Sequence, residues 1–383
     1  MNVKIKLMID VVQRYLTRID GLGLDPRVVL IRHQYVVALQ MSARYPEAAA
    51  MQRETSLMAN RLGDSRSKAY SLANEINVST IVAPMPLDKF AIVKREAIKA
   101  ASETPDAYIQ NWTRFVVGWQ EFHRGRQNEA RNVAGELMQV GRTLSDPRSI
   151  GLGLALLAFI ALVGDSYAEA LEYSEQSLAV AITAFDRNVA ILAKGGALVL
   201  LRRTDEGLKL LEANKRRCVT DGDLYSLVAS EGIIGVGKVL QGNITQGIRL
   251  LEEGISRREK EGYRSTADWY RLFLSEVYLQ IITGKEKPPL LILLRNLPIL
   301  VKVMFTASSR IPAMMASIFT NPQYLPEGHH VGHAEMILGL LYKAKKNRDL
   351  AVQHLLKGKQ ILSQFGQTPM LVRLDTALAE LGQ

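Results

Sequence analysis

The chain has 383 residues, and its 48 Lys and Arg against 38 Asp and Glu give a formal net charge of +10. A hydrophobic fraction of 48% is ordinary for a packed protein and excludes an intrinsically disordered chain. Cys218 is the only cysteine, which excludes a disulfide framework. The length allows about two or three domains unless the chain is a repeat array. The composition predicts a reduced, soluble, cytoplasmic protein.

The N-terminus does not read as an export signal, because Lys4, Lys6 and Asp10 interrupt its apolar residues. The uncharged run from Ser149 to Gly164 is shorter than the roughly 20 residues that a membrane-spanning helix needs. We therefore expect no membrane span, and we interpret Ser149–Gly164 as a buried helix.

A short phrase recurs along the chain: a small or polar turn is followed by Glu or Gln and then by Ala or Gly. Copies of this phrase end at Ala48, Ala130, Ala170, Gly207 and Gly247, and a divergent copy ends at Ala351. From Ala130 to Gly247 the steps between copies are 40, 37 and 40 residues. A fixed period of this length is typical of a repeat architecture.

A second small residue lies twelve positions before each of the later copies, at Gly118, Ala158, Gly195, Gly235 and Gly339. Two small residues on neighbouring antiparallel helices would allow their backbones to approach closely. The flanking apolar residues follow a helical period, and a helix pair of this kind must stack on its neighbours to bury its apolar face. The pattern predicts an all-α, right-handed superhelical solenoid.

The order of Gly339, Tyr342, Ala351 and Leu355 resembles the tetratricopeptide repeat, with its small, aromatic, small and bulky positions. The other copies are degenerate and longer than the usual unit of about 34 residues. The resemblance implies a scaffold that binds proteins or peptides.

Several longer phrases, densest after about Trp112, are similar to the C-terminal repeat region of rhizobial-type class III adenylate and guanylate cyclases. Those proteins carry a cyclase domain and an ATPase domain ahead of the repeats. The phrases are Phe122–Arg126, Ala184–Arg187, Ala267–Tyr278, Lys287–Leu297, Asn321–Gln323 and Gly339–Lys345. The resemblance implies that cyclase and ATPase domains are partners in the same polypeptide or pathway, and that this chain is not itself an enzyme.

The array is interrupted once, which divides the chain into three parts. Residues 1–284 are predicted to form repeats of about 40 residues. Residues 285–332 are predicted to form an irregular insertion of helices and loops, because prolines punctuate it, with a helix over Leu290–Phe305. Residues 333–383 are predicted to form a last repeat and a capping helix. Nearer the N-terminus, Ser79–Pro86 is interpreted as a loop before a helix at Lys89–Ala101.

Three sequence features resemble a nucleotide-binding, a metal-binding or a reactive-cysteine site. Gly232–Val239 matches most of a phosphate-binding loop, but it has Val239 where Ser or Thr would hold magnesium, and it lies in a repeat helix. His329, His330 and His333 match no standard zinc spacing, and we interpret them as a polar loop. Cys218 follows three basic residues, yet a plain surface thiol is the favoured interpretation. No catalytic residue, metal or cofactor is predicted.

Partner-binding residues are expected on the helices that line the concave face of the solenoid. Aromatic and basic side chains favour binding hot spots, although aromatic residues at helical spacing also pack between repeats. The candidates are Arg114, Phe115, Trp119, Phe122, His123, Trp269, Arg271 and Lys343. Nucleic acid is not expected, because the basic residues are scattered. The predicted function is a non-catalytic protein interaction or regulatory module. The alternative is a ligand-sensing domain that binds a peptide or small molecule in its groove.

Overall fold

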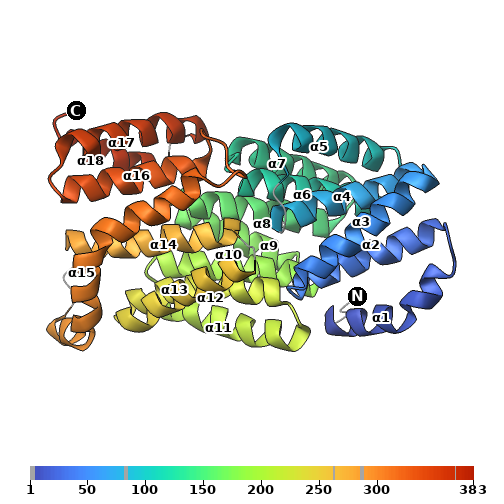
Figure 1. Cartoon of the computed structure of the whole chain (residues 1–383), viewed down its shortest axis with the longest axis horizontal. Helices are drawn as coiled ribbons and strands as arrows, with labels where there is room; N and C mark the ends of the chain where they lie inside the picture. The colour runs from blue at the N-terminus through green and yellow to red at the C-terminus, as the bar shows by residue number, and fades with distance from the viewer. Residues whose placement is uncertain (1–4, 82–84, 262–263, 285–288, 367) are drawn as a thin grey trace.

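The computed structural model describes residues 5–81, 85–261, 264–284, 289–366 and 368–383. Over these residues the chain forms eighteen α-helices and one short 3-10 helix, and no strand. The helices follow one another as stacked pairs, so the predicted all-α solenoid is confirmed (Figure 1).

The even-numbered helices up to α16 form one series. They are α2 (Pro26–Met41), α4 (Ser65–Ile81), α6 (Ala107–His123), α8 (Pro147–Val163), α10 (Ala184–Leu200), α12 (Leu224–Leu240), α14 (Arg264–Thr283) and α16 (His329–Ala344). Each of them packs against the next member of the series as well as against its neighbours in sequence. The even-numbered helices therefore form a continuous layer.

The odd-numbered helices form the second layer, and α18 follows the last pair. The odd-numbered helices are α1 (Ile5–Asp20), α3 (Tyr45–Leu62), α5 (Leu87–Ser102), α7 (Gln127–Thr143), α9 (Tyr167–Ala179), α11 (Thr204–Asp221), α13 (Ile244–Lys260), α15 (Leu290–Phe319) and α17 (Arg348–Leu362). The last helix, α18, is Pro369–Ala379. The short 3-10 helix is Ser363–Phe365.

Small residues set the spacing within a helix pair, as the repeat predicts. A Cβ atom added at Gly207 would lie 2.9 Å from the carbonyl oxygen of Gly195 on the preceding helix. A Cβ atom at Gly339 would lie 2.6 Å from Cγ of Leu355. Since real carbon atoms do not approach this closely, glycine is required for these helices to cross at their observed distance.

The turn inside most pairs has a residue with left-handed backbone at one fixed position, with φ between 59° and 83°. The residues at this position are Ala43, Gly125, Asp165, Arg202, Gly242 and Lys346. The amide of the next residue then donates to a carbonyl in the last turn of the preceding helix, as Asn347 N does to Tyr342 O at 2.9 Å. This is the Schellman arrangement, and it gives each pair the same sharp reversal.

The solenoid curls until helices five pairs apart touch. Helix α2 contacts α12, and α4 contacts α14 (Figure 1). Tyr45 packs against Tyr225 across this contact. Further along, the amide of His329 donates to the carbonyl oxygen of Gly125 at 2.9 Å. The N-terminal and C-terminal pairs therefore meet around the layer of even-numbered helices.

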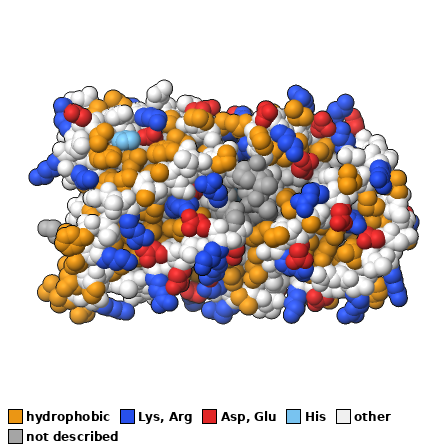
Figure 2. All heavy atoms as spheres, viewed as in Figure 1, with side chains coloured by type: hydrophobic (Ala, Val, Ile, Leu, Met, Phe, Trp, Pro, Cys, Tyr) orange, Lys and Arg blue, Asp and Glu red, His pale blue; other side chains and the backbone are white. Residues whose placement is uncertain are grey.

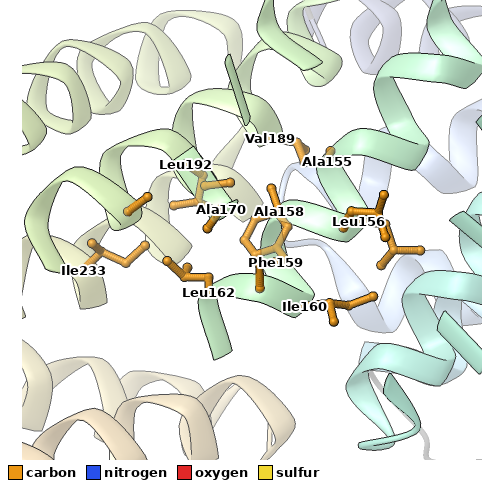
Figure 3. Close-up of a cluster of buried hydrophobic side chains, with 14 of the residues drawn as sticks. Ala155, Leu156, Ala158, Phe159, Ile160, Leu162, Ala170, Val189, Leu192 and Ile233 are labelled. Atoms are coloured by element: carbon orange, nitrogen blue, oxygen red, sulfur yellow. The ribbon is translucent and has the colours of Figure 1, made fainter. Parts of the chain in front are cut away.

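The central hydrophobic core is built around α8. Ala155, Ala158 and Phe159 pack with Val189 of α10 and Ile233 of α12 (Figure 3). Helix α8 is buried along nearly its whole length, which confirms the buried helix predicted for Ser149–Gly164.

Two predictions about irregular segments are corrected. The helix predicted at Leu290 continues to Phe319, with Pro298 and Pro312 inside it, where separate irregular helices were expected. Figure 1 shows α15 bent along its length, which is how a helix accommodates an interior proline. In the predicted loop Ser79–Pro86, residues 79–81 belong to α4 and residues 82–84 lie outside the described residues.

Two predictions about surface residues are also wrong. His329, His330 and His333 lie in the first turns of α16 rather than in a loop, and His330 stacks on Tyr324 with ring centroids 4.5 Å apart. Cys218 is fully buried, and burial raises the pKa of its thiol to about 12. It is therefore an inert core residue rather than a surface thiol.

The left-handed turn residues predict a stabilising substitution. Lys346 has φ of 59° and is exposed, so Lys346→Gly relieves backbone strain without removing a core contact. We expect the free energy of unfolding to rise by about 1 kcal/mol, measured by urea denaturation. Lys345, with φ of −80°, is the matched control. Lys345→Gly should lower the stability, and an equal response of the two variants would contradict this explanation.

Candidate functional site: the central cavity

A cavity of about 950 Å³ lies between the even-numbered helices. Its walls come from α6, α8, α10, α12, α14 and α16, and α18 contributes one further side. A cavity of this size is at the upper end of the range of roughly 300–1,000 Å³ that small-molecule sites occupy in proteins. Because the solenoid curls, its concave layer of helices surrounds this cavity.

Aromatic rings form a continuous wall of this cavity from α6 to α14. Trp119 stacks on Phe122 with ring centroids 5.5 Å apart, and Phe122 stacks on Trp269 at the same distance. Phe159 of α8 meets Trp119 edge to face at 5.1 Å. The indole N–H of Trp119 donates to the hydroxyl of Tyr225 at 3.2 Å. These contacts fix the rings as a rigid apolar surface.

Five of the eight candidate residues from the sequence line the cavity. They are Trp119, Phe122, His123, Trp269 and Lys343. They come from three helices, α6, α14 and α16, that are far apart in sequence. The structure therefore brings together the two aromatic groups that the sequence predicts separately.

The other three candidates do not line the cavity. Phe115 is buried between repeats, against Trp112 and Phe185. Arg114 lies on α6 with its guanidinium donating to the backbone oxygen of Gln110 at 3.1 Å.

Arg271 is buried in ion pairs with Asp268, at 2.5 Å, and with Glu259. Because its guanidinium compensates the buried charge of Asp268, it is not available to bind a partner in the cavity.

The His123 ring in the cavity wall lacks hydrogen-bond partners among the described residues. Both ring nitrogens of His123 are unpaired, although the residue is only 8% exposed. Burial lowers the pKa of His123 to about 4, so the neutral ring offers one donor and one acceptor. The hydroxyl of Ser226, 1% exposed, lies against the buried carboxylate of Asp223 and interacts with it. Buried polar groups are normally hydrogen-bonded, so the His123 ring stands out in this wall as a polar group without a partner.

Ion pairs from α18 close one side of the cavity. Arg373 donates to Asp165 Oδ2 at 2.8 Å and to Glu276 Oε2 at 2.9 Å. His333 Nε2 lies 3.0 Å from Glu276 Oε1. Burial would raise the pKa of Glu276, but Arg373 and His333 outweigh it and hold that pKa at about 2. Lys343 is similarly paired with Glu380, so most charges facing the cavity are already compensated.

Sequence reasoning does not find Ser226, Glu276 or Arg373. Arg373 and Asp165 are 208 residues apart, and no local pattern marks either of them. Only the curl of the solenoid places them at one site.

The segments that resemble a nucleotide-binding or metal-binding motif in the sequence do not form such a site among the described residues. A Cβ atom at Gly232 would lie 2.8 Å from Cζ of Tyr270, so this glycine makes room for a ring inside α12. Within the described residues no group of three His, Cys, Asp or Glu side chains is placed to hold a metal ion.

Comparison with known proteins shows the fold. No family model matches the chain, and no curated protein matches it in sequence. Among solved structures, a Rap protein complexed with Competence and Sporulation Factor is similar to it with a TM-score of 0.55 and 13% identity. That similarity covers 92% of this chain and 98% of the Rap chain.

A designed circular tandem repeat protein also aligns, over 98% of this chain and 88% of its own, with 12% identity and a TM-score of 0.20. A TM-score of 0.20 is too low to indicate a shared fold. The protein is a helical repeat protein, and over 92% of the chain its helices are arranged as in the Rap protein.

The Glu276 cluster predicts a pH-dependent stability. Glu276→Gln removes the carboxylate charge that contacts both Arg373 and His333. We expect the free energy of unfolding to fall by about 2 kcal/mol near neutral pH. Because the folded pKa is depressed, this contribution is complete above about pH 4.5 and is lost as the pH falls toward 2. Urea denaturation of both proteins at several pH values measures it. A difference that stays constant down to pH 2 would contradict the assignment.

Proposed function

We propose that the chain is a non-catalytic binding module that takes a short segment of a protein partner into its central cavity. The observation that carries this proposal is the aromatic wall of Trp119, Phe122 and Trp269 around a cavity of about 950 Å³. Rigid aromatic surfaces of this kind anchor apolar side chains in protein interfaces.

The polar atoms of the cavity fit the chemistry of a peptide. A neutral His123 ring can donate one hydrogen bond and accept another. A peptide backbone supplies the matching carbonyl and amide groups. Since Arg373, Glu276 and Lys343 are paired within the chain, the segment is predominantly apolar and not highly charged.

The similarity to the Rap protein supports this proposal at the level of the fold. That protein was solved in complex with Competence and Sporulation Factor, so a solenoid of this arrangement can hold a second molecule. For this chain the partner is inferred from the cavity alone.

A second candidate function is the sensing of a small uncharged molecule. The two unpaired ring nitrogens of His123 favour it equally, because one compact ligand could satisfy them. The two functions differ in the extent of the site: a peptide occupies the whole aromatic wall, whereas a small ligand needs only one part of it.

The context proposed for this module is cytoplasmic signalling. The sequence phrases similar to the cyclase repeat region suggest adenylate cyclase or ATPase domains in the same polypeptide or pathway. The comparisons do not bear on that relation, so its support is the phrases alone. We expect the purified chain to form no cyclic AMP from ATP with magnesium or manganese, measured by chromatography. Turnover that survives further purification would overturn the non-catalytic proposal.

A substitution that fills the cavity tests the proposed site. Ala229 lines the cavity on α12, and Ala229→Trp would occupy it without removing any contact residue. We expect the affinity for a captured partner, and for the synthetic peptide that represents its binding segment, to fall at least tenfold in calorimetry.

Ala91, exposed on α5, is the matched control, and Ala91→Trp should bind as the original chain does. Equal affinity of Ala229→Trp and Ala91→Trp would exclude the cavity as the site. Thermal stabilisation by an uncharged small molecule, lost in Ala229→Trp while no peptide binds, would instead establish the sensing function.

A further inference from the structure

The N-terminal half of α15 carries an exposed apolar face that the proposed function does not use. Seven of its large apolar side chains are between 42% and 83% exposed. They are Leu290, Leu291, Leu294, Leu297, Val301, Met304 and Phe305. Figure 2 shows hydrophobic side chains gathered at the lower left of the molecule, where Figure 1 places α15. Together they present on the order of 500 Å² of apolar surface, which marks an interaction site on a soluble domain.

The opposite face of α15 holds the helix firmly against the core. Val303, Ala307, Ile311 and Met315 recur every four residues and are fully buried against the rest of the domain. Toward the N-terminal end, Asn296 donates to the carbonyl oxygen of Gly242 at 2.9 Å. The apolar face is therefore presented outward in a fixed orientation.

The charged residues of α15 itself are all basic. Helix α15 contains no Asp or Glu, whereas Arg295 and Lys302 are exposed at one margin of the apolar face. At 100° per residue these two positions lie within about 20° of each other on the helix. A surface with an apolar strip and a basic margin complements anionic lipid headgroups above an acyl layer.

A second copy of the chain fits this face less well. Each copy carries a net charge of +10, and protein interfaces normally have rims with charges of both signs. The acids needed to pair Arg295 and Lys302 across a symmetric contact are missing from α15.

We propose that α15 is a membrane-surface helix, which lies on an anionic lipid bilayer with the exposed apolar side chains between Leu290 and Phe305 facing the acyl chains. By length and composition α15 could cross a membrane, and only 17% of its most apolar window is buried. Its buried stripe of Val303, Ala307 and Ile311, however, keeps it alongside the core, so it lies on the bilayer rather than spanning it. Arg295 and Lys302 then reach the headgroups.

Vesicle cosedimentation of the full chain tests this proposal. The chain should sediment with vesicles of equal parts phosphatidylcholine and phosphatidylglycerol, and only weakly with phosphatidylcholine alone. Leu291→Ser and Phe305→Ser should each weaken partitioning about tenfold, because each removes a side chain that enters the acyl region. Arg295→Gln and Lys302→Gln should each weaken it about fivefold, and added salt should weaken it further.

The matched control is Leu57→Ser, since Leu57 is 64% exposed on α3, away from α15. It should sediment as the original chain does, and circular dichroism should show every variant folded. Equal loss in Leu57→Ser, or binding that does not depend on phosphatidylglycerol, would overturn the proposal. So would a dimer in light scattering that Phe305→Ser converts to a monomer, because it would assign the face to a second copy.

Discussion

The close approach of paired helices at small residues is the constraint on which the rest of the structure depends. Where Gly207 meets the backbone of Gly195, no side chain separates the two helices. The same close approach recurs between α12 and α13, where a Cβ atom at Gly247 would meet the carbonyl oxygen of Gly235. The tightly packed pairs stack in a curl until α2 and α12 meet, and the layer of even-numbered helices surrounds a cavity. Small residues at the crossings thus set how closely the helices of each pair pack, and the stacked pairs form the cavity.

The sequence predicts those parts of the fold that depend on local spacing. The phrases that end at Ala130, Ala170 and Gly207 give the period, and the small residues twelve positions earlier give the crossings. Helical period in the flanks is also local, so the helices of these pairs follow from it. Pro298 shows the limit of such reasoning, because packing along α15 outweighs the helix-breaking tendency of a proline.

The candidate site is predicted only in part, because it forms by closure. Trp119 and Trp269 can be chosen from the sequence as aromatic residues near small positions, and both line the cavity. Arg271, chosen by the same argument, instead neutralises a buried acid, and the sequence cannot tell these roles apart. Glu276 and Arg373 lie 97 residues apart, and no sequence motif marks either of them as part of a site.

The contact between α2 and α12 also changes how this repeat protein should unfold. In an open solenoid each repeat touches only its neighbours, so the ends fray and the array can melt in stages. Here the carbonyl of Gly125 and the amide of His329 join pairs that are about 200 residues apart. Such links make the stability of the first pairs depend on the last ones. We therefore expect the domain to unfold as one cooperative unit, in which loss of the C-terminal pair destabilises the N-terminal pairs across the closure.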